Sequence, residues 1–99
     1  MPGDHHVVVR LLPKDGHASM LEAELVALAT ASVASPYCLR FDVATLTDGV
    51  GYLLHEAFVD AEAYARHCET AHARRFLDKT LPEHVADRVV EVLRPRNGT

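Results

Sequence analysis

The stretch from His55 to Phe76 concentrates side chains that can exchange protons or bind a metal. It holds three histidines, His55, His67 and His72, and a cysteine, Cys68. Imidazole titrates near neutral pH and is also the commonest metal ligand, so both chemistries have to be considered. Two metal ligands on one helix normally lie three or four residues apart. His67 and His72 are five apart and would point about 140° apart on a straight helix, which argues against a metal site.

His67 is the candidate general base. The apolar stripe of the helix expected here runs through Ala61, Tyr64, Ala65, Cys68 and Ala71. His67 lies on one margin of this stripe, beside Ala63 and Thr70, whose small side chains leave room for a ligand. The competing interpretation is a partly buried structural histidine with one hydrogen bond, which periodicity alone favours. His72 lies on the other margin and is expected to be solvated.

A carboxylate and two tyrosines accompany this histidine. Alternation places Tyr52, Leu54, Glu56 and Phe58 on one face of a strand and His55 on the other. A buried Glu56 would need a partner, and Arg40 or Arg75 could form a structural ion pair with it. Tyr64 and Tyr52 are either plain core aromatics or hydroxyl donors to a ligand.

Six elements have to position these residues. Alternating or β-branched stretches predict strands, and apolar residues three or four apart predict helices. The expected strands cover residues 5–12, 37–45, 50–59 and 86–94, the expected helices cover residues 17–33 and 60–77, and residues 81–84 are expected to form a loop. Asp48-Gly49 predicts a hairpin turn between the second and third strands.

Three local patterns add detail. Ser19 and Glu22 match a capping box at the start of the first helix, although the helix could begin two residues earlier. Asp60 is expected to cap the second helix. The side chains that share one face of the second strand are expected to be Tyr37, Leu39, Phe41 and Val43.

The order β-α-β-β-α-β predicts an α+β, ferredoxin-like fold with one antiparallel sheet and both helices on one face. The other face would then carry apolar residues without helical cover. This predicts that a second sheet packs on it, and hence a homodimer. The chain is expected to form a single domain over residues 1–99, with a core at about residues 5–94.

Composition excludes several classes of protein. The 99 residues carry a net charge of -4 with histidine neutral, unlike a basic nucleic-acid-binding surface. We find no apolar run long enough to cross a membrane and no secretory signal, so neither a nucleic-acid nor a membrane partner is expected and the cytoplasm is the expected location. The two cysteines do not form a Cys-x-x-Cys pair.

Three groups of residues carry a family resemblance. They are Pro36, Cys38, Leu39, Phe41, Asp42 and Val43; then Glu56, Phe58, Asp60 and Ala63; then His67, Thr70, His72 and Phe76. In this order they resemble the antibiotic biosynthesis monooxygenase (ABM) domain of the dimeric α/β-barrel superfamily, over about residues 6–93. The third group is fairly specific for the family but not for one activity.

The chain departs from the family pattern at three places. Ser35-Pro36-Tyr37 stands where Glu-Pro-Gly is usual, Phe58 stands where tryptophan is usual, and Ala71 stands where a proline often ends the helix. With Ala71 the helix either continues or breaks. A break would void the angle argument for His72.

The resemblance implies a cavity between sheet and helices in each subunit, and a homodimer whose two sheets close a barrel. Family members include cofactor-independent monooxygenases of phenols and quinols, isomerases of small sugar-derived ketones, and haem-degrading oxygenases. The haem branch uses an asparagine on the first strand, a tryptophan and an axial histidine. Here His67 stands at the tryptophan position, Leu77 falls near the histidine position, and the only asparagine is Asn97, so haem is not expected.

The favoured hypothesis is a cofactor-independent monooxygenase that uses O2 and a small phenol- or quinol-type aromatic substrate, with no metal. His67 would be the base, Tyr64 and Tyr52 would orient the substrate hydroxyls, Phe58 would stack on its ring, and Glu56 would belong to the same substrate site. Two alternatives remain open. One is a small-molecule isomerase or tautomerase in the same pocket, and the other is a non-catalytic dimer that binds a small ligand.

Overall fold

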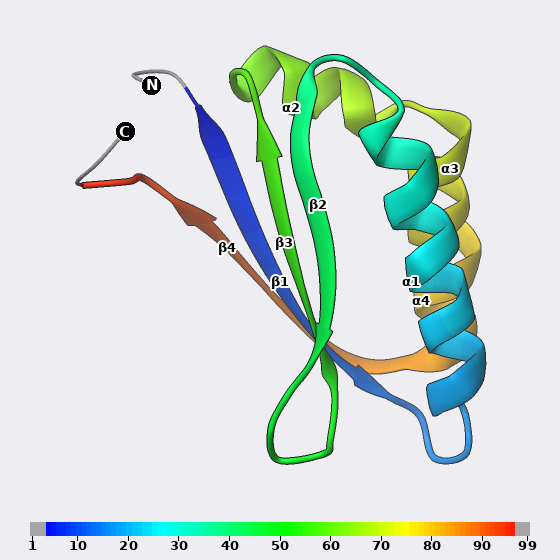
Figure 1. The fold of residues 1–99 in the computed structure, drawn as a ribbon. Helices are drawn as coiled ribbons and strands as arrows, with labels where there is room; N and C mark the ends of the chain where they lie inside the picture. The colour runs from blue at the N-terminus through cyan, green and yellow to red at the C-terminus, as the bar shows by residue number, and fades with distance from the viewer. Residues whose placement is uncertain (1–3, 97–99) are drawn as a thin grey trace.

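The computed structural model describes residues 4–96 and has an α+β, ferredoxin-like fold (Figure 1). The four strands are β1 (His5–Pro13), β2 (Cys38–Thr45), β3 (Tyr52–Phe58) and β4 (Val85–Leu93). They form one antiparallel sheet in the order β2-β3-β1-β4. The long helix α1 (Ala18–Val33) and the helical segments that follow β3 lie on one side of this sheet. The predicted order of strands and helices is confirmed.

The core lies between α1 and the inner face of the sheet. The apolar side chains buried there are Val7, Val9, Leu11, Leu21, Leu25, Leu28, Tyr52, Leu54 and Phe58. The predicted alternation of β3 is confirmed, and its register places Val7 opposite Glu56. Ser32 shares the buried face of α1 because its hydroxyl donates a hydrogen bond of 2.7 Å to the carbonyl of Leu28.

The predicted alternation of β2 is wrong at Leu39. The pairing of β2 with β3 shifts between Cys38 and Arg40, which marks a β-bulge. The extra residue of a bulge moves the following side chains to the other face. Cys38 and Phe41 are therefore both buried, while Leu39 is 52% exposed. The bulge places Phe41 on the inner face, directly opposite Glu56.

The predicted single helix over residues 60–77 is also wrong. The chain forms four helical segments here, namely α2 (Ala61–Cys68), α3 (Ala71–Arg75), the π-helical turn η1 (Phe76–Thr80) and α4 (Leu81–His84). The loop expected at residues 81–84 is thus a helical turn. Asp60 caps α2 as predicted, because its carboxylate accepts a hydrogen bond of 2.7 Å from the Ala63 amide.

Thr70 breaks the helix before α3. Its backbone is extended, and its hydroxyl accepts a hydrogen bond from the Ala73 amide, so it is the N-cap of a new helix. The same hydroxyl donates a hydrogen bond of 2.7 Å to the carbonyl of His67. Ala71 therefore does not keep the helix continuous. In the first helix the Ser19 capping box is wrong, but the alternative start two residues earlier is confirmed, since α1 begins after His17 without a side-chain cap.

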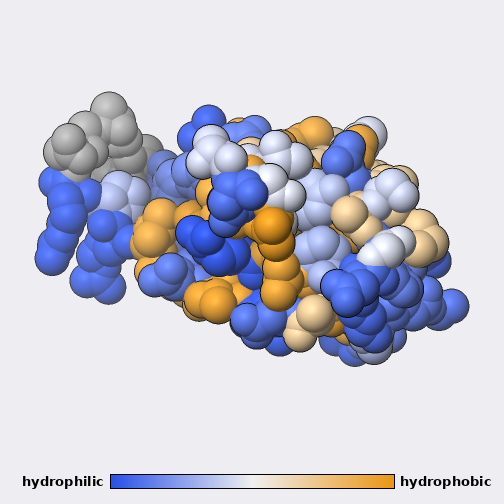
Figure 2. All heavy atoms as spheres, turned by 90° about the horizontal axis from the view of Figure 1, so that it is seen from below, coloured by the Kyte–Doolittle hydropathy of each residue, from blue (hydrophilic) through white to orange (hydrophobic). Residues whose placement is uncertain are grey.

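In the described part of the chain, the sheet face opposite the helices has no helical cover (Figure 1). β4 lies at one edge of the sheet. Its large apolar side chains are exposed, namely Val89, Val90, Val92 and Leu93. Apolar side chains also gather among polar ones at the end of the molecule seen in Figure 2. Within residues 4–96, no helix is long and apolar enough to cross a membrane.

Candidate functional site

A buried carboxylate and a buried imidazole face each other between sheet and helix. Glu56 lies on the inner face of β3, and His67 follows Ala63 by four residues on the face of α2 turned toward the sheet. Glu56 is 6% exposed and His67 5%, and His67 Nε2 lies 3.9 Å from Glu56 Oε1. His67 is therefore not on the half-exposed margin that the sequence predicted. Ala63 and His67 form the buried face of α2.

Aromatic rings enclose this pair. The His67 ring lies 4.9 Å from that of Phe58, 5.8 Å from that of Phe41 and 6.3 Å from that of Tyr64, between ring centroids. The Phe58 and Tyr64 rings are 5.3 Å apart. Four of the five predicted site residues, His67, Glu56, Tyr64 and Phe58, are thus brought together. Phe41 joins them from the neighbouring strand β2, on the face that alternation predicted for it together with Val43.

Burial shifts the acid–base properties of the pair toward its neutral form. Desolvation raises the pKa of Glu56 from 4.5 to about 7. Desolvation, and then the proximity of His72, lowers the pKa of His67 from 6.5 to about 4. Burial also raises the pKa of Tyr64, so its phenol keeps its proton. At neutral pH, His67 is a free base that can accept a proton, and a large share of Glu56 is a neutral acid that can donate one.

The ion pairs expected for Glu56 are wrong. Arg40 pairs with Asp42 at 2.6 Å, and Arg75 pairs with Glu24 at 3.0 Å. Glu56 instead has only the His67 ring as a charged or chargeable partner within 4 Å among residues 4–96. A carboxyl group that is buried without a cation favours its protonated form. This explains why its pKa rises rather than falls.

His72 is half-buried in the short helix α3 rather than fully solvated. Since Thr70 starts a new helix, the angle argument fails, and the His72 ring lies 5.7 Å from the His67 ring. Its Nε2 atom is buried and has no hydrogen-bond partner among the described residues. A helix break at Thr70 was the only sequence signal for this contact. Groups of three or more side chains suited to a metal ion are absent from residues 4–96.

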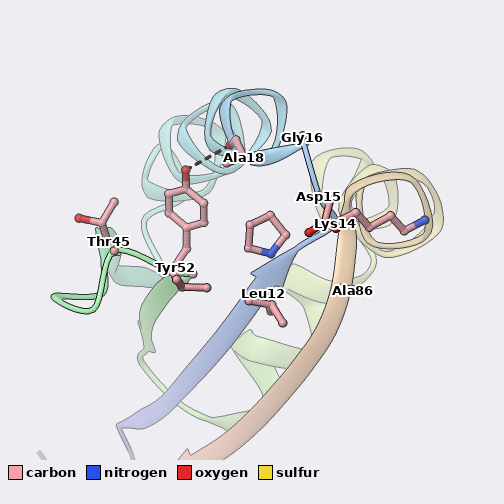
Figure 3. Close-up of a pocket in the computed structure, with 12 residues that line it drawn as sticks. Leu12, Lys14, Asp15, Gly16, Ala18, Thr45, Tyr52 and Ala86 are labelled. Atoms are coloured by element: carbon pink, nitrogen blue, oxygen red, sulfur yellow. Dashed lines mark hydrogen bonds between the residues drawn. The ribbon is translucent and has the colours of Figure 1, made fainter.

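Tyr52 does not belong to this cluster. Its hydroxyl donates to the carbonyl of Ala18 at 3.1 Å and to Glu22 at 3.0 Å, near the start of α1. Figure 3 shows this ring at a separate cavity of about 520 Å³, between the β1–α1 loop, the β2–β3 hairpin and the start of β4. Tyr52 and Glu56 share a strand face, but they lie four positions apart along the extended strand. Alternation gives the face of a strand and not the distance along it.

The structure shows two further histidine contacts that were not predicted from the sequence. His17 Nδ1 lies 2.9 Å from His84 Nδ1, and His6 Nδ1 lies 3.1 Å from His55 Nε2. The second pair follows from the register of β1 and β3, because His6 lies opposite Ala57, two residues from His55 on the same face. Neither pair contacts Glu56 or His67 through a hydrogen bond or ion pair that the structure shows.

The two buried groups predict an unusual pH dependence of stability. The pKa of Glu56 is raised on folding, so the free energy of unfolding falls as pH rises from about 4.5 to about 7. The pKa of His67 is lowered on folding, so the free energy of unfolding rises as pH rises from about 4 to about 6.5. In the native protein these slopes oppose each other. Glu56→Gln should remove the first and expose the second, a rise of up to about 3 kcal/mol.

Urea unfolding at several pH values between 4 and 7 measures this effect. The matched control is Glu69→Gln, which neutralises an exposed carboxylate at the end of α2 and should keep the native profile. If Glu56→Gln shows no rise of stability with pH, His67 is not held neutral by burial.

Comparison with known proteins finds one matching family model and several similar solved structures. A family model described as antibiotic biosynthesis monooxygenase matches residues 4–79. No curated protein matches the chain. Among solved structures, Rv0793 from Mycobacterium tuberculosis is 25% identical with a TM-score of 0.91, covering 97% of this chain and 98% of that one. PA3566 from Pseudomonas aeruginosa is 26% identical with a TM-score of 0.87, covering 96% of each chain. SO0527 from Shewanella oneidensis is 25% identical with a TM-score of 0.88, covering 92% of this chain and 89% of that one.

Proposed function

Because the chain belongs to the antibiotic biosynthesis monooxygenase family, we propose that it oxidises a small phenol or quinol with O2 and without a bound cofactor. The observation that carries the proposal is the buried pair of Glu56 and His67 within a wall of aromatic rings. The His67 imidazole is deprotonated at neutral pH and is therefore free to accept the proton of a phenolic hydroxyl. The rings of Phe58 and Tyr64 supply an apolar surface against which an aromatic substrate can stack.

The reaction needs only a proton acceptor and an electron-rich substrate. His67 takes the proton of a substrate hydroxyl, and the anion gives an electron to O2. The two radicals then combine at a ring carbon, and the resulting peroxide anion takes back the proton from His67 to form a hydroperoxide. Loss of water leaves a new carbonyl on that carbon, so one quinol and one O2 give one hydroxyquinone and one H2O. The substrate supplies all four electrons, and the protein supplies orientation, proton removal and exclusion of water.

Glu56 and Tyr64 have separate roles in this scheme. Glu56 in its protonated form donates a hydrogen bond to the substrate oxygen or to the developing peroxide. The 3.9 Å gap between Glu56 and His67 is too long for a direct hydrogen bond, but a hydroxyl between them can contact both groups. Tyr64 keeps its proton and is only partly buried, so we place the substrate entrance beside its ring.

Oxygen consumption with a panel of hydroquinones tests the proposal. We expect protein-dependent O2 uptake in a 1:1 ratio to substrate, with one oxygen atom of labelled O2 in the product and no accumulation of H2O2. Simple autoxidation would give H2O2 and a product without the label. Binding of quinols without any uptake of O2 would instead support a non-catalytic ligand-binding protein and would refute the oxygenase.

A second candidate function is an isomerase or tautomerase. The observation that favours it is that one member of the pair can donate a proton and the other can accept one at neutral pH. Such a pair can move a proton between adjacent atoms of a small ketone without O2. Exchange of substrate hydrogen for solvent deuterium under anaerobic conditions would identify this activity.

We also propose that two copies pack through the uncovered side of the sheet. Val89 and Leu93 lie on the same sheet face as His6 and Arg10, their register partners, and both are more than 40% exposed. Contiguous exposed apolar side chains on a soluble protein commonly mark an interface. The chain should therefore sediment as a dimer at micromolar concentration.

A charge on this face should weaken the dimer. Val89→Glu is expected to shift the sedimentation coefficient toward that of a monomer, because taking a carboxylate out of water at an interface is costly even with Arg10 opposite it. Val26→Glu is the matched control, since Val26 is exposed on α1, away from the sheet face. A native protein that sediments as a monomer would refute the proposed dimer.

A further inference from the structure

We propose that His72 transfers protons between His67 and a small cavity walled by Glu24, Arg75 and Thr80. The inference rests on the proposed role of His67 as a base. The residue concerned, His72, would exchange protons with that base rather than with the substrate. The proton on His67 would then exchange with solvent through the helical layer and not through the substrate entrance.

The need for such a route follows from the burial of the pair. His67 and Glu56 are each less than a tenth exposed, and aromatic rings surround the imidazole. An imidazole that has accepted a proton here is costly, because burial lowers its pKa to about 4. In the oxygenase scheme the proton returns to the peroxide, but until then the cation stays buried. A nearby group that can take up the proton and give it back would lower this cost.

His72 is placed to be that acceptor. The break at Thr70 turns α3 so that the His72 ring lies 5.7 Å from the His67 ring. Its buried Nε2 atom has no hydrogen-bond partner among residues 4–96. A buried ring nitrogen without a partner is destabilising, and one water can serve both rings at this separation. The arrangement is unfavourable for a structural histidine and suitable for one that exchanges protons.

The far side of His72 opens toward solvent. With Glu24 and Arg75, it lines a cavity of about 110 Å³ between α1 and the segments α3 and η1. This volume exceeds what a single water requires. Glu24 accepts hydrogen bonds from Arg75 at 3.0 Å and from the buried Thr80 hydroxyl at 3.2 Å. Glu24 and Arg75 are partly exposed at this wall and connect the cavity with bulk water.

The charged and titratable groups around His72 fit one direction of transfer. A proton passes from a ring nitrogen of His67 on α2 to one ring nitrogen of His72. His72 then releases a proton from its second nitrogen to water in the cavity, so no net charge stays behind. The carboxylate of Glu24 on α1 favours a positive charge at this wall of the cavity. Arg75 on α3 is already paired with Glu24. On the inner side, the carboxyl group of Glu56 of β3 lies beyond His67.

Exchange of the His67 ring proton with water tests the inference without any substrate. In protein labelled with ¹⁵N-histidine, the rate can be measured by saturation transfer from water. We expect His72→Phe to slow this exchange at least about tenfold, since a positioned proton-transfer group contributes more than that. His72→Gln should slow it as well, although glutamine can still form hydrogen bonds, because glutamine does not titrate. Added imidazole should restore part of the rate.

The matched control is His55→Gln, which alters a half-buried histidine on the opposite face of the sheet and should leave the His67 exchange rate unchanged. Equal exchange rates in native protein and both His72 variants would overturn the inference, whether exchange is fast or slow. That result would leave the oxygenase proposal standing. Absence of O2 uptake by the native protein would refute the oxygenase proposal and leave the exchange result readable.

Discussion

Replacing His67 with alanine is expected to lower turnover of a confirmed quinol substrate by roughly 100-fold or more, the usual contribution of a general base. The reason is geometric as well as chemical. His67 is the only imidazole within ion-pair distance of Glu56 among residues 4–96, and the aromatic wall holds its ring. No other described base replaces it at that point. Steady-state O2 uptake per folded molecule measures the effect.

The same substitution should also lower stability. His67 is buried rather than half-exposed, so alanine leaves a cavity and removes ring contacts, a loss of about 1–3 kcal/mol. His67→Gln is the cleaner variant, because it keeps most of the volume and loses the titrating ring. His55→Ala is the control of the same type outside the cluster, and its turnover should stay near that of the native protein. If His67→Gln retains full turnover, His67 is not the base, and the ionised form of Glu56 becomes the better candidate.

Replacing Phe58 with alanine should cost about 3–5 kcal/mol of the free energy of unfolding. Phe58 is completely buried, and its ring contacts both Tyr64 and His67. A domain of this size commonly has only about 5–15 kcal/mol of stability in total, so a large part of it should be lost. Urea unfolding measures the change directly.

A second Phe58 variant separates packing from substrate contact. Phe58→Leu keeps most of the apolar volume and should cost less than about 1.5 kcal/mol. If the Phe58 ring stacks on the substrate, this variant should raise KM while the protein remains folded. Phe76→Ala is the matched control for the alanine change, because Phe76 is only partly buried, and its loss of stability should be smaller. Equal losses at Phe58 and Phe76 would contradict the central place given to Phe58.

The order of elements and most of the core followed from periodicity alone. Alternation in β3 identified Tyr52, Leu54, Glu56 and Phe58 as one buried face, because each residue of a strand reverses direction. Apolar residues three or four apart predicted the helix α1, whose buried side chains Leu21, Leu25 and Leu28 recur at that spacing. On the β3 face, Glu56 was visible as a polar exception. The sequence therefore pointed to four residues that the structure brings together, whereas Tyr52 lies apart from them.

Two irregularities account for the errors at the site. The bulge at Leu39 shifts β2 by one residue, and no local residue type announces it. The break at Thr70 reorients α3, although Ala71 is a good helix former. The bulge turns Leu39 outward and Cys38 inward, and the break brings His72 to the cluster. Both depend on tertiary packing, which a pattern of residue types does not contain.

The edge position of β4 has a consequence for aggregation. Within the described chain this strand pairs only with β1, so its outer N–H and C=O groups are free to pair with any extended chain. Val89, Val90, Val92 and Leu93 make it strongly β-forming, and Glu91 alone interrupts the run. Glu91 thus acts as a gatekeeper, whatever its role in folding. A substitution that removes the charge of Glu91 would leave protomers that have not yet assembled prone to associate through this edge.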